Sequence, residues 1–351
     1  MSAAIRSLKI PQLVKVCRQP LETNPRVVRG YDATGEAVCR SNKMERGSRD
    51  ARPDSHAFFM STPLHIPVMP DEILRLLEPR PGQIIVDCTV GAGGHTRLLA
   101  EKVAPAGRVI GLDQDPAMLD LARPQLAGLP VTLLQRNFED LPGVLQELQI
   151  GPVDAELADL GFCSDQLANP ERGLSFQHDG PLDMRLDPTR GEPARALVQR
   201  LQERELAALF WEYGEERHSR RIARAIVEAR RQSRLDTTSQ LADLVRRCVP
   251  RSRGNPIDPA TRVFQALRIA VNDELGALER FLDALPECVK PGGIAAVISF
   301  HSLEDRRVKQ AFRRKETWVE LTRKPLTAGV AEISINPRSR SAKLRAARRV
   351  G

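Results

Sequence analysis

The chain has 351 residues, a formal net charge of +8, 41% hydrophobic residues and 4% aromatic residues. No apolar run is long enough to cross a bilayer, so the composition excludes a helical membrane protein and favours an α/β protein with a sizeable core. The six cysteines form no C-x-x-C pair and the six histidines no H-x-H or H-E-x-x-H pair, so we expect reduced thiols, no bound metal and a cytoplasmic location.

The first 59 residues have weak periodicity, with Pro, Gly, Ser and Arg scattered through them. This composition predicts a largely disordered basic extension. Its first 20 residues contain four basic residues and no acidic one, which is typical of an organellar transit peptide. A mis-assigned start codon is the alternative that we favour, because Met60 opens a segment that resembles a natural N-terminus.

A glycine-rich loop follows the first predicted strand. The apolar run 84–86 predicts a buried strand, residues 87–96 read D-C-T-V-G-A-G-G-H-T, and residues 97–103 have helical spacing. A second strand, 108–113, ends in Asp113, 22 positions after Gly91, where an acid accepts hydrogen bonds from ribose hydroxyls in nucleotide-binding sheets.

The details of this loop predict the cofactor. It lacks the third glycine of G-x-G-x-x-G, and Asp87 would repel a pyrophosphate but would suit a cationic ligand. The pattern therefore favours S-adenosyl-L-methionine over NAD or ATP. The alternative is a tight turn without a ligand.

Strand and helix alternate over the next segment and then stop. Helices are predicted at 116–126 and 141–150, and strands at 131–134 and 154–160. Four such steps predict a parallel, doubly wound sheet. Beyond Gly161 come polar loops and then helices only, so we expect a first sheet part at 60–166, an inserted all-helical domain at 167–262, and a second sheet part at 263–351.

The second sheet part is predicted to begin with one long amphipathic helix from Phe264 to Leu285, followed by a buried strand at 294–300. Ser302 is the predicted N-cap of the next helix. Residues 301–351 hold 14 Lys and Arg against 5 acids, whereas residues 60–300 are net acidic. A basic end suits a nucleic acid partner, and a solvated charged tail is the alternative. The candidate phosphate contacts are Arg338, Arg340, Lys343 and Arg345.

Several motifs resemble those of the MraW-type 16S ribosomal RNA cytosine-N4 methyltransferases. They are H-I-P-V-M at 65–69, D-x-T-x-G-x-G-G-H at 87–95, D-Q-D-P at 113–116, D-L-G at 159–161, G-P-L-D-M-R at 180–185, Y-G-E-E at 213–216, F-Q-A-L-R-I-A-V-N at 264–272, S-F-H-S-L-E-D-R at 299–306 and N-P-R-S-R-S at 336–341. Two stretches depart from the family pattern. Phe162-Cys163-Ser164-Asp165-Gln166 stands where Val-Ser-Ser-Pro-Gln is usual, and Leu174 stands where Phe is usual.

The resemblance implies a class I methyltransferase fold, a Rossmann-like doubly wound sheet with an inserted all-helical domain. It also implies methylation of a cytidine at position 1402, in the usual numbering, of the small-subunit RNA. Phe138 would lie against the adenine of the cofactor, and Asp159 and Gln166 would meet its polar edges. Carried over by position, the cofactor-binding residues are Gly93, Gly94, His95, Asp113, Phe138, Asp159 and Gln166.

Methylation of the cytosine amino group requires an acceptor for one of its hydrogens. The N4 lone pair is delocalised into the ring, so in-line placement contributes most and a carboxylate accepts the proton. Asp159, at the end of a predicted strand, is the first catalytic candidate and Asp183 the second. His301, Glu304 and Asp305 follow the next strand and either line the same cleft or cap a helix.

Two other functions remain open: methylation of another RNA or a small molecule, because the fold is compatible with many reactions, and RNA binding without catalysis. The expected partner is 16S ribosomal RNA or the small ribosomal subunit, with no membrane association. A homodimer is possible.

Overall fold

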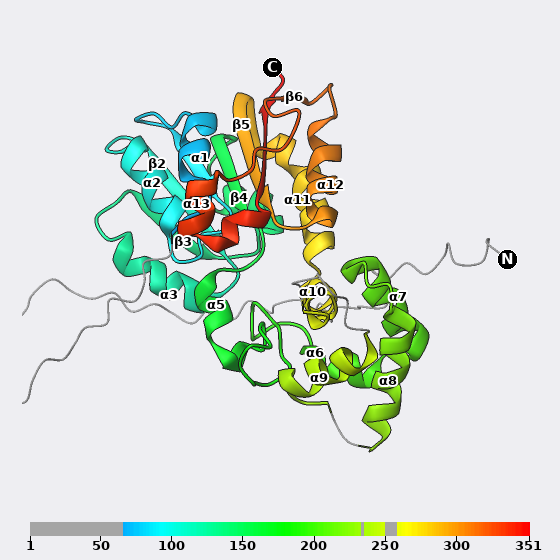
Figure 1. Ribbon diagram of the computed structural model, residues 1–351. Coiled ribbons are helices and arrows are strands. Elements are labelled where there is room, and N and C mark those ends of the chain that lie inside the picture. Colours follow the sequence, from blue (N-terminus) through cyan, green and yellow to red (C-terminus); the bar gives the residue numbers. More distant parts are fainter. Residues whose placement is uncertain (1–65, 233–234, 250–257) are drawn as a thin grey trace, which may run out of the picture. The chain divides into compact units, whose positions relative to one another are not determined.

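The computed structural model describes residues 66–232, 235–249 and 258–351. The predicted extension 1–59 and the start at Met60 lie outside these residues. Within these residues, seven strands form one sheet in the order β3-β2-β1-β4-β5-β7-β6 (Figure 1). Their bounds are β1 Ile84–Asp87, β2 Arg108–Asp113, β3 Val131–Gln135, β4 Val153–Asp159, β5 Val289–Ser299, β6 Trp318–Glu320 and β7 Lys343–Arg349.

The predicted parallel sheet is confirmed for the first five strands, which pair in parallel. This order, which reverses direction between β1 and β4, is the doubly wound Rossmann-like arrangement. Strand β7 was not predicted. It runs antiparallel between β5 and β6, with Lys343 opposite Ser299, so the basic segment at the end of the chain forms part of the sheet.

Helices cover both faces of the sheet because its strands are apolar on both sides. Successive strand residues point to opposite faces. Thus Ile85 packs against α1 and α2, while Val86 belongs to the core that holds α4, α11 and α12. The helices concerned are α1 Pro70–Leu77, α2 Gly94–Val103, α3 Pro116–Gln125, α4 Leu141–Glu147, α11 Glu274–Cys288 and α12 Ser302–Phe312, with α13 Val330–Ile335 near the end of the chain.

A second hydrophobic core belongs to the helices that follow β4 and precede α11. These are α5 Ser164–Ala168, α6 Ala194–Arg200, α7 Glu203–Gly214, α8 Ser219–Gln232, α9 Thr238–Cys248 and α10 Ala260–Val271. Its buried residues run from Leu174 to Ala270, so α10 packs with the helices before it. The domain limits 167 and 262 stay a prediction. None of the helices in the described part of the chain combines the length and apolarity that a bilayer span requires.

Two local predictions were wrong. The long helix predicted from Phe264 is broken at Asn272 and Asp273, because Asp273 adopts a left-handed conformation with φ of 49°. The Asn272 side chain bonds the backbone of Met184 and Leu186, which fixes the break. The N-cap of α12 is His301, not Ser302, and the Glu304 carboxylate accepts the backbone N–H of His301 at 3.3 Å.

Candidate functional site

The glycine loop after β1 is held from beneath by Asp87. Its carboxylate accepts hydrogen bonds from the Thr96 hydroxyl at 2.6 Å and from the Thr89 N–H at 3.1 Å. The side chain is fully buried, and this burial raises the pKa of Asp87 to about 6. Asp87 therefore braces the loop. The expectation that it faces a cationic ligand was wrong.

Asp113, at the end of β2, closes the other side of the loop. One carboxylate oxygen accepts the N–H of Gly91 and the other the N–H of Asp115, each at 2.8 Å. Burial raises the pKa of Asp113 to about 7, although these two hydrogen bonds act in the opposite direction. Each oxygen keeps a second lone pair, so the group can still accept a ligand hydroxyl.

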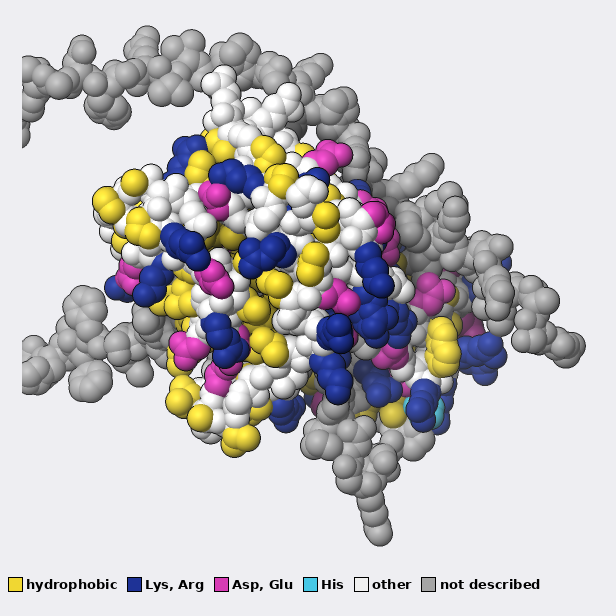
Figure 2. Space-filling view, turned by 90° about the horizontal axis from the view of Figure 1, so that it is seen from above, with side chains coloured by type: hydrophobic (Ala, Val, Ile, Leu, Met, Phe, Trp, Pro, Cys, Tyr) yellow, Lys and Arg dark blue, Asp and Glu magenta, His cyan; other side chains and the backbone are white. Residues whose placement is uncertain are grey.

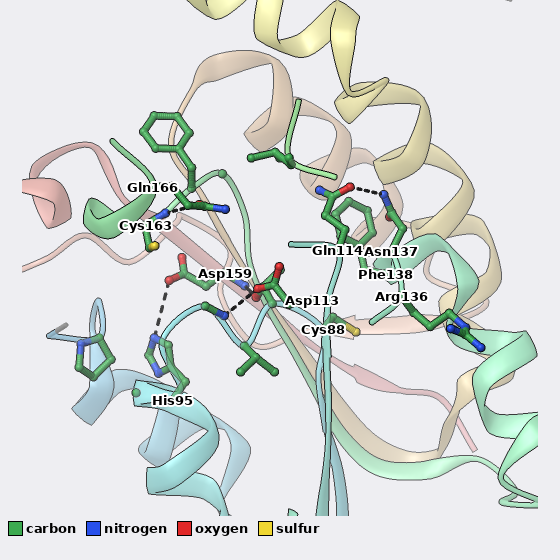
Figure 3. Close-up of a pocket in the computed structure, with 18 of the residues that line it drawn as sticks. Cys88, His95, Asp113, Gln114, Arg136, Asn137, Phe138, Asp159, Cys163 and Gln166 are labelled. Carbon is green, nitrogen blue, oxygen red and sulfur yellow. Dashed lines mark hydrogen bonds and ion pairs between the residues drawn. The ribbon is translucent and has the colours of Figure 1, made fainter. Parts of the chain in front are cut away.

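A pocket opens beside this loop, at the carboxyl ends of β1, β2 and β4, where open α/β sheets bind ligands (Figure 3). Phe138 lies at one end of it and the Asp159–His95 pair at the other. Of the seven predicted cofactor residues, six line the pocket: Gly94, His95, Asp113, Phe138, Asp159 and Gln166. The seventh, Gly93, does not line it. It caps α2 with φ of 93°, where a side chain would be strained.

Asp159 is the acid at the end of β4. Its backbone N–H donates to the Thr89 hydroxyl at 2.6 Å, and one carboxylate oxygen lies 3.9 Å from His95 Nε2 (Figure 3). The other oxygen, Oδ1, is buried without a hydrogen-bond partner among the described residues. Burial raises the pKa of Asp159 to about 7, while the positive charge of Arg338 opposes the rise. The group is therefore set to exchange a proton near neutral pH.

The sequence of nearly all the described residues matches the model of one protein family. The model of the MraW methylase family matches residues 62–350. The chain belongs to this family. It is accordingly a methyltransferase, and its methyl donor is S-adenosyl-L-methionine.

Bacterial proteins named Ribosomal RNA small subunit methyltransferase H are similar over most of their length. That of Sorangium cellulosum is 52% identical over 289 residues, which are 82% of this chain and 91% of that protein. That of Rhodopirellula baltica is 46% identical over 324 residues, 89% of this chain and 100% of that protein. Among solved structures, a putative rRNA methylase from Clostridium thermocellum covers 80% of this chain and 93% of its own, with a TM-score of 0.39 and 13% identity, too weak a likeness to support an argument.

In this MraW-family chain, sequence reasoning missed the ion pair beneath Gln166. Asp115, whose side chain is 1% exposed, accepts hydrogen bonds from Arg172 Nη1 and Gln166 Nε2, each at 2.7 Å. The other end of the Gln166 amide accepts the Cys163 N–H. Gln166 thus uses both polar atoms within the protein and fixes the wall of the pocket. The motif D-Q-D-P contains Asp115, but no sequence pattern near it indicates an ion pair with Arg172, which lies 57 residues further on.

The second catalytic candidate, Asp183, lies outside this pocket. Both of its carboxylate oxygens bind the Arg185 guanidinium, at 2.7 and 2.8 Å, and Asp183 is not among the residues that line the pocket. The structure therefore does not bring it to the predicted cofactor residues, and a role as proton acceptor does not fit.

The four predicted phosphate contacts separate into three environments. Arg345 is 4% exposed and pairs with Asp305 at 2.6 Å, so its position in β7 contradicts the predicted contact with RNA. Arg338 lines the pocket and donates to the carbonyl of Phe162. Arg340 is exposed, and Lys343 is partly exposed. Figure 2 shows basic side chains spread over one face of the molecule with acidic side chains among them.

One group of side chains bears on the prediction of no metal. Glu274, His301 and Glu304 each offer a ligand atom, and these atoms lie within 4.8 Å of one another. All three already interact within the protein, since His301 Nε2 lies 3.1 Å from a carboxylate oxygen of Glu304. Glu274 forms a two-point ion pair with Arg268, and Glu304 accepts backbone N–H groups at the start of α12. The absence of a metal stays a prediction.

Proposed function

We propose that this chain methylates the N4 amino group of one cytidine in 16S ribosomal RNA, at position 1402 in the usual numbering. The observation that carries the proposal is the buried Asp159 carboxylate, with a pKa of about 7, at the end of β4 in the pocket. The similarity to proteins named Ribosomal RNA small subunit methyltransferase H supports the choice of RNA.

The residues of the pocket fit S-adenosyl-L-methionine. Asp113 presents a carboxylate suited to the two ribose hydroxyls, and the half-buried Phe138 ring offers an apolar surface to the adenine. Asp159, with one oxygen that lacks a partner among the described residues, offers negative charge at the opposite end, where a sulfonium would lie. When bound, the cofactor supplies an electrophilic methyl group.

Asp159 performs the acid–base part of the reaction in this proposal. Its carboxylate accepts a hydrogen bond from the N4 amino group, which localises the nitrogen lone pair for attack on the methyl carbon. The proton that N4 loses passes to the same carboxylate and then to solvent. The hydrogen bond from the Asp159 N–H to Thr89 fixes the backbone at this point, so the carboxylate is preorganised.

The test is incubation of the protein with labelled S-adenosyl-L-methionine and unmodified small ribosomal subunits, followed by identification of the labelled nucleoside. N4-methylcytidine is the expected product. Label in another nucleoside or in a small molecule supports a different methyltransferase. Tight RNA binding without label supports a non-catalytic binding protein.

Three further statements complete the proposal. A cytoplasmic location is part of this proposal, supported by relatives whose names specify the small ribosomal subunit. Residues 167–262 form the inserted helical domain of this proposal, supported by the separate hydrophobic core from Leu174 to Ala270. Self-association as a homodimer is testable by light scattering during size-exclusion chromatography.

A further inference from the structure

A second cavity adjoins the cofactor pocket. It has a volume of about 390 Å³, which lies in the range of small-molecule sites. Gly161, Phe162 and Arg338 line both cavities, so the two cavities are neighbours at the end of β4. The second cavity therefore lies beside the pocket that fits the methyl donor.

The second cavity is lined by phenyl rings. Aromatic residues make up only 4% of the chain, yet four of its ten phenylalanines, Phe162, Phe176, Phe264 and Phe300, line this one space. Phe176 and Phe264 meet edge to face, with ring centroids 4.8 Å apart. Phe162, Phe176 and Phe300 are only half-buried, which distinguishes them from ordinary core rings. They leave apolar ring surface open to a ligand.

Arginine side chains accompany three of these rings. Arg268 lies 4.4 Å from the centroid of Phe162, and Arg338 lies 5.8 Å from that of Phe300. Arg246 stands 5.6 Å from the ring of Phe176. Aromatic surface beside arginine is the combination that proteins use for unstacked nucleic acid bases, because the ring stacks on the base and the cation attracts the phosphate backbone.

Two of the residues that differ from the family pattern, Phe162 and Leu174, line this cavity, whereas Cys163 and Asp165 do not. Phe162 replaces the usual Val, and Leu174 replaces the usual Phe. One position therefore gains a ring where the other loses one, and the combined side-chain volume changes by about one methylene group. The ring therefore stands at position 162, which lines both this cavity and the cofactor pocket, and not at position 174.

We propose that this cavity receives the target pyrimidine base, extruded from the RNA, and that Phe162 is the ring on which the base stacks. The inference rests on the proposed function and specifies how its substrate is held. In this proposal the exocyclic amino group of the stacked base points past Gly161 and Phe162 toward Asp159. Arg268 lines the same cavity, lies over the Phe162 ring and is held there by its ion pair with Glu274. Enzymes that modify a base hold it in this way, outside the nucleic acid stack.

The test compares variants of the full-length protein on unmodified small subunits. Phe162→Val should lower kcat/KM for the subunits about tenfold, the effect of losing one base–aromatic contact. Its affinity for S-adenosylhomocysteine, measured by calorimetry, should stay within about twofold of wild type. Phe162→Tyr, which keeps the ring, and the double variant F162V/L174F, which returns a ring to position 174, should each recover most of the activity. Trp211→Val, which removes a 58% exposed ring outside the cavity, is the matched control and should behave as wild type.

Three results would overturn the inference while leaving the proposed function intact. The first is a Phe162→Val variant as active as wild type. The second is an equal loss of S-adenosylhomocysteine affinity, which would assign the ring to the cofactor pocket. The third is an F162V/L174F variant as impaired as Phe162→Val. If Phe162→Val does not fold, the activities of Phe162→Tyr and F162V/L174F on the subunits test the inference. A wild-type protein that does not methylate the subunits overturns both the function and the inference.

Discussion

Replacing Asp159 by Asn should affect stability and activity in opposite directions. Burial raises the pKa of Asp159 from 3.8 to about 7, so the folded protein binds a proton more tightly than the unfolded chain does. Between about pH 4 and pH 7 the folded state holds more protons, and the free energy of unfolding falls as the pH rises. The protonated carboxyl makes its full contribution to the free energy of unfolding below pH 4, and this contribution is lost as the pH passes about 7.

The size of the effect follows from the shift. About three pKa units correspond to an upper limit of about 4 kcal/mol at pH 8. Asn has nearly the same shape and carries no charge. We expect Asp159→Asn to be more stable than wild type by about 2 kcal/mol at pH 8, with a difference close to zero at pH 4.

The activity of the same variant should fall because the amide cannot accept the N4 proton. A loss of kcat of about 10²- to 10⁴-fold is expected, and in the wild type kcat/KM should rise as the pH increases through about 7. Urea unfolding at pH 4 and pH 8 measures the first effect, and transfer of labelled methyl groups measures the second. Asp120→Asn, on a side chain 78% exposed, is the control and should change neither. Equal stability differences at the two pH values would refute the argument from burial, and an unchanged kcat would refute the role as acceptor.

Three other changes test the remaining parts of the site. Asp113→Ala should weaken S-adenosyl-L-methionine binding by about 1.5–3 kcal/mol, and calorimetry that shows wild-type affinity would contradict its assignment to the ribose. Arg172→Ala leaves the buried Asp115 carboxylate without its cation and should lower the free energy of unfolding by about 3–5 kcal/mol, measured in urea; a loss below 1 kcal/mol would show that the pair matters little. The double variant R340A/K343A should reduce the log–log salt dependence of RNA binding by about one to two units in filter binding, and an unchanged slope would mean that neither side chain contacts phosphate.

Local sequence patterns predicted the strand–loop–helix unit around Gly91. Apolar β-branched runs and glycine spacing act over a few residues, so the first five strands and the pocket at their carboxyl ends followed from the chain alone. The position of Asp113 at the edge of the pocket followed from the same reasoning, because parallel neighbouring strands end at the same edge of a sheet. Asp159 was found in the same way, at the end of β4.

Long-range contacts decided the rest. Composition described the end of the chain as a basic tail, whereas pairing with β5 placed Arg345 inside the sheet, where Asp305 neutralises it. The sequence suggested that Asp87 contacts a ligand. In the structure its carboxylate accepts a hydrogen bond from the hydroxyl of Thr96, nine residues further on, and is buried. The ring of Phe162 meets Arg268 only in the folded protein, because 106 positions separate them in the sequence. A local sequence pattern shows which groups can form hydrogen bonds or ion pairs. The partner of a buried charge or ring depends on which segments the folded sheet brings together, and the whole chain determines that.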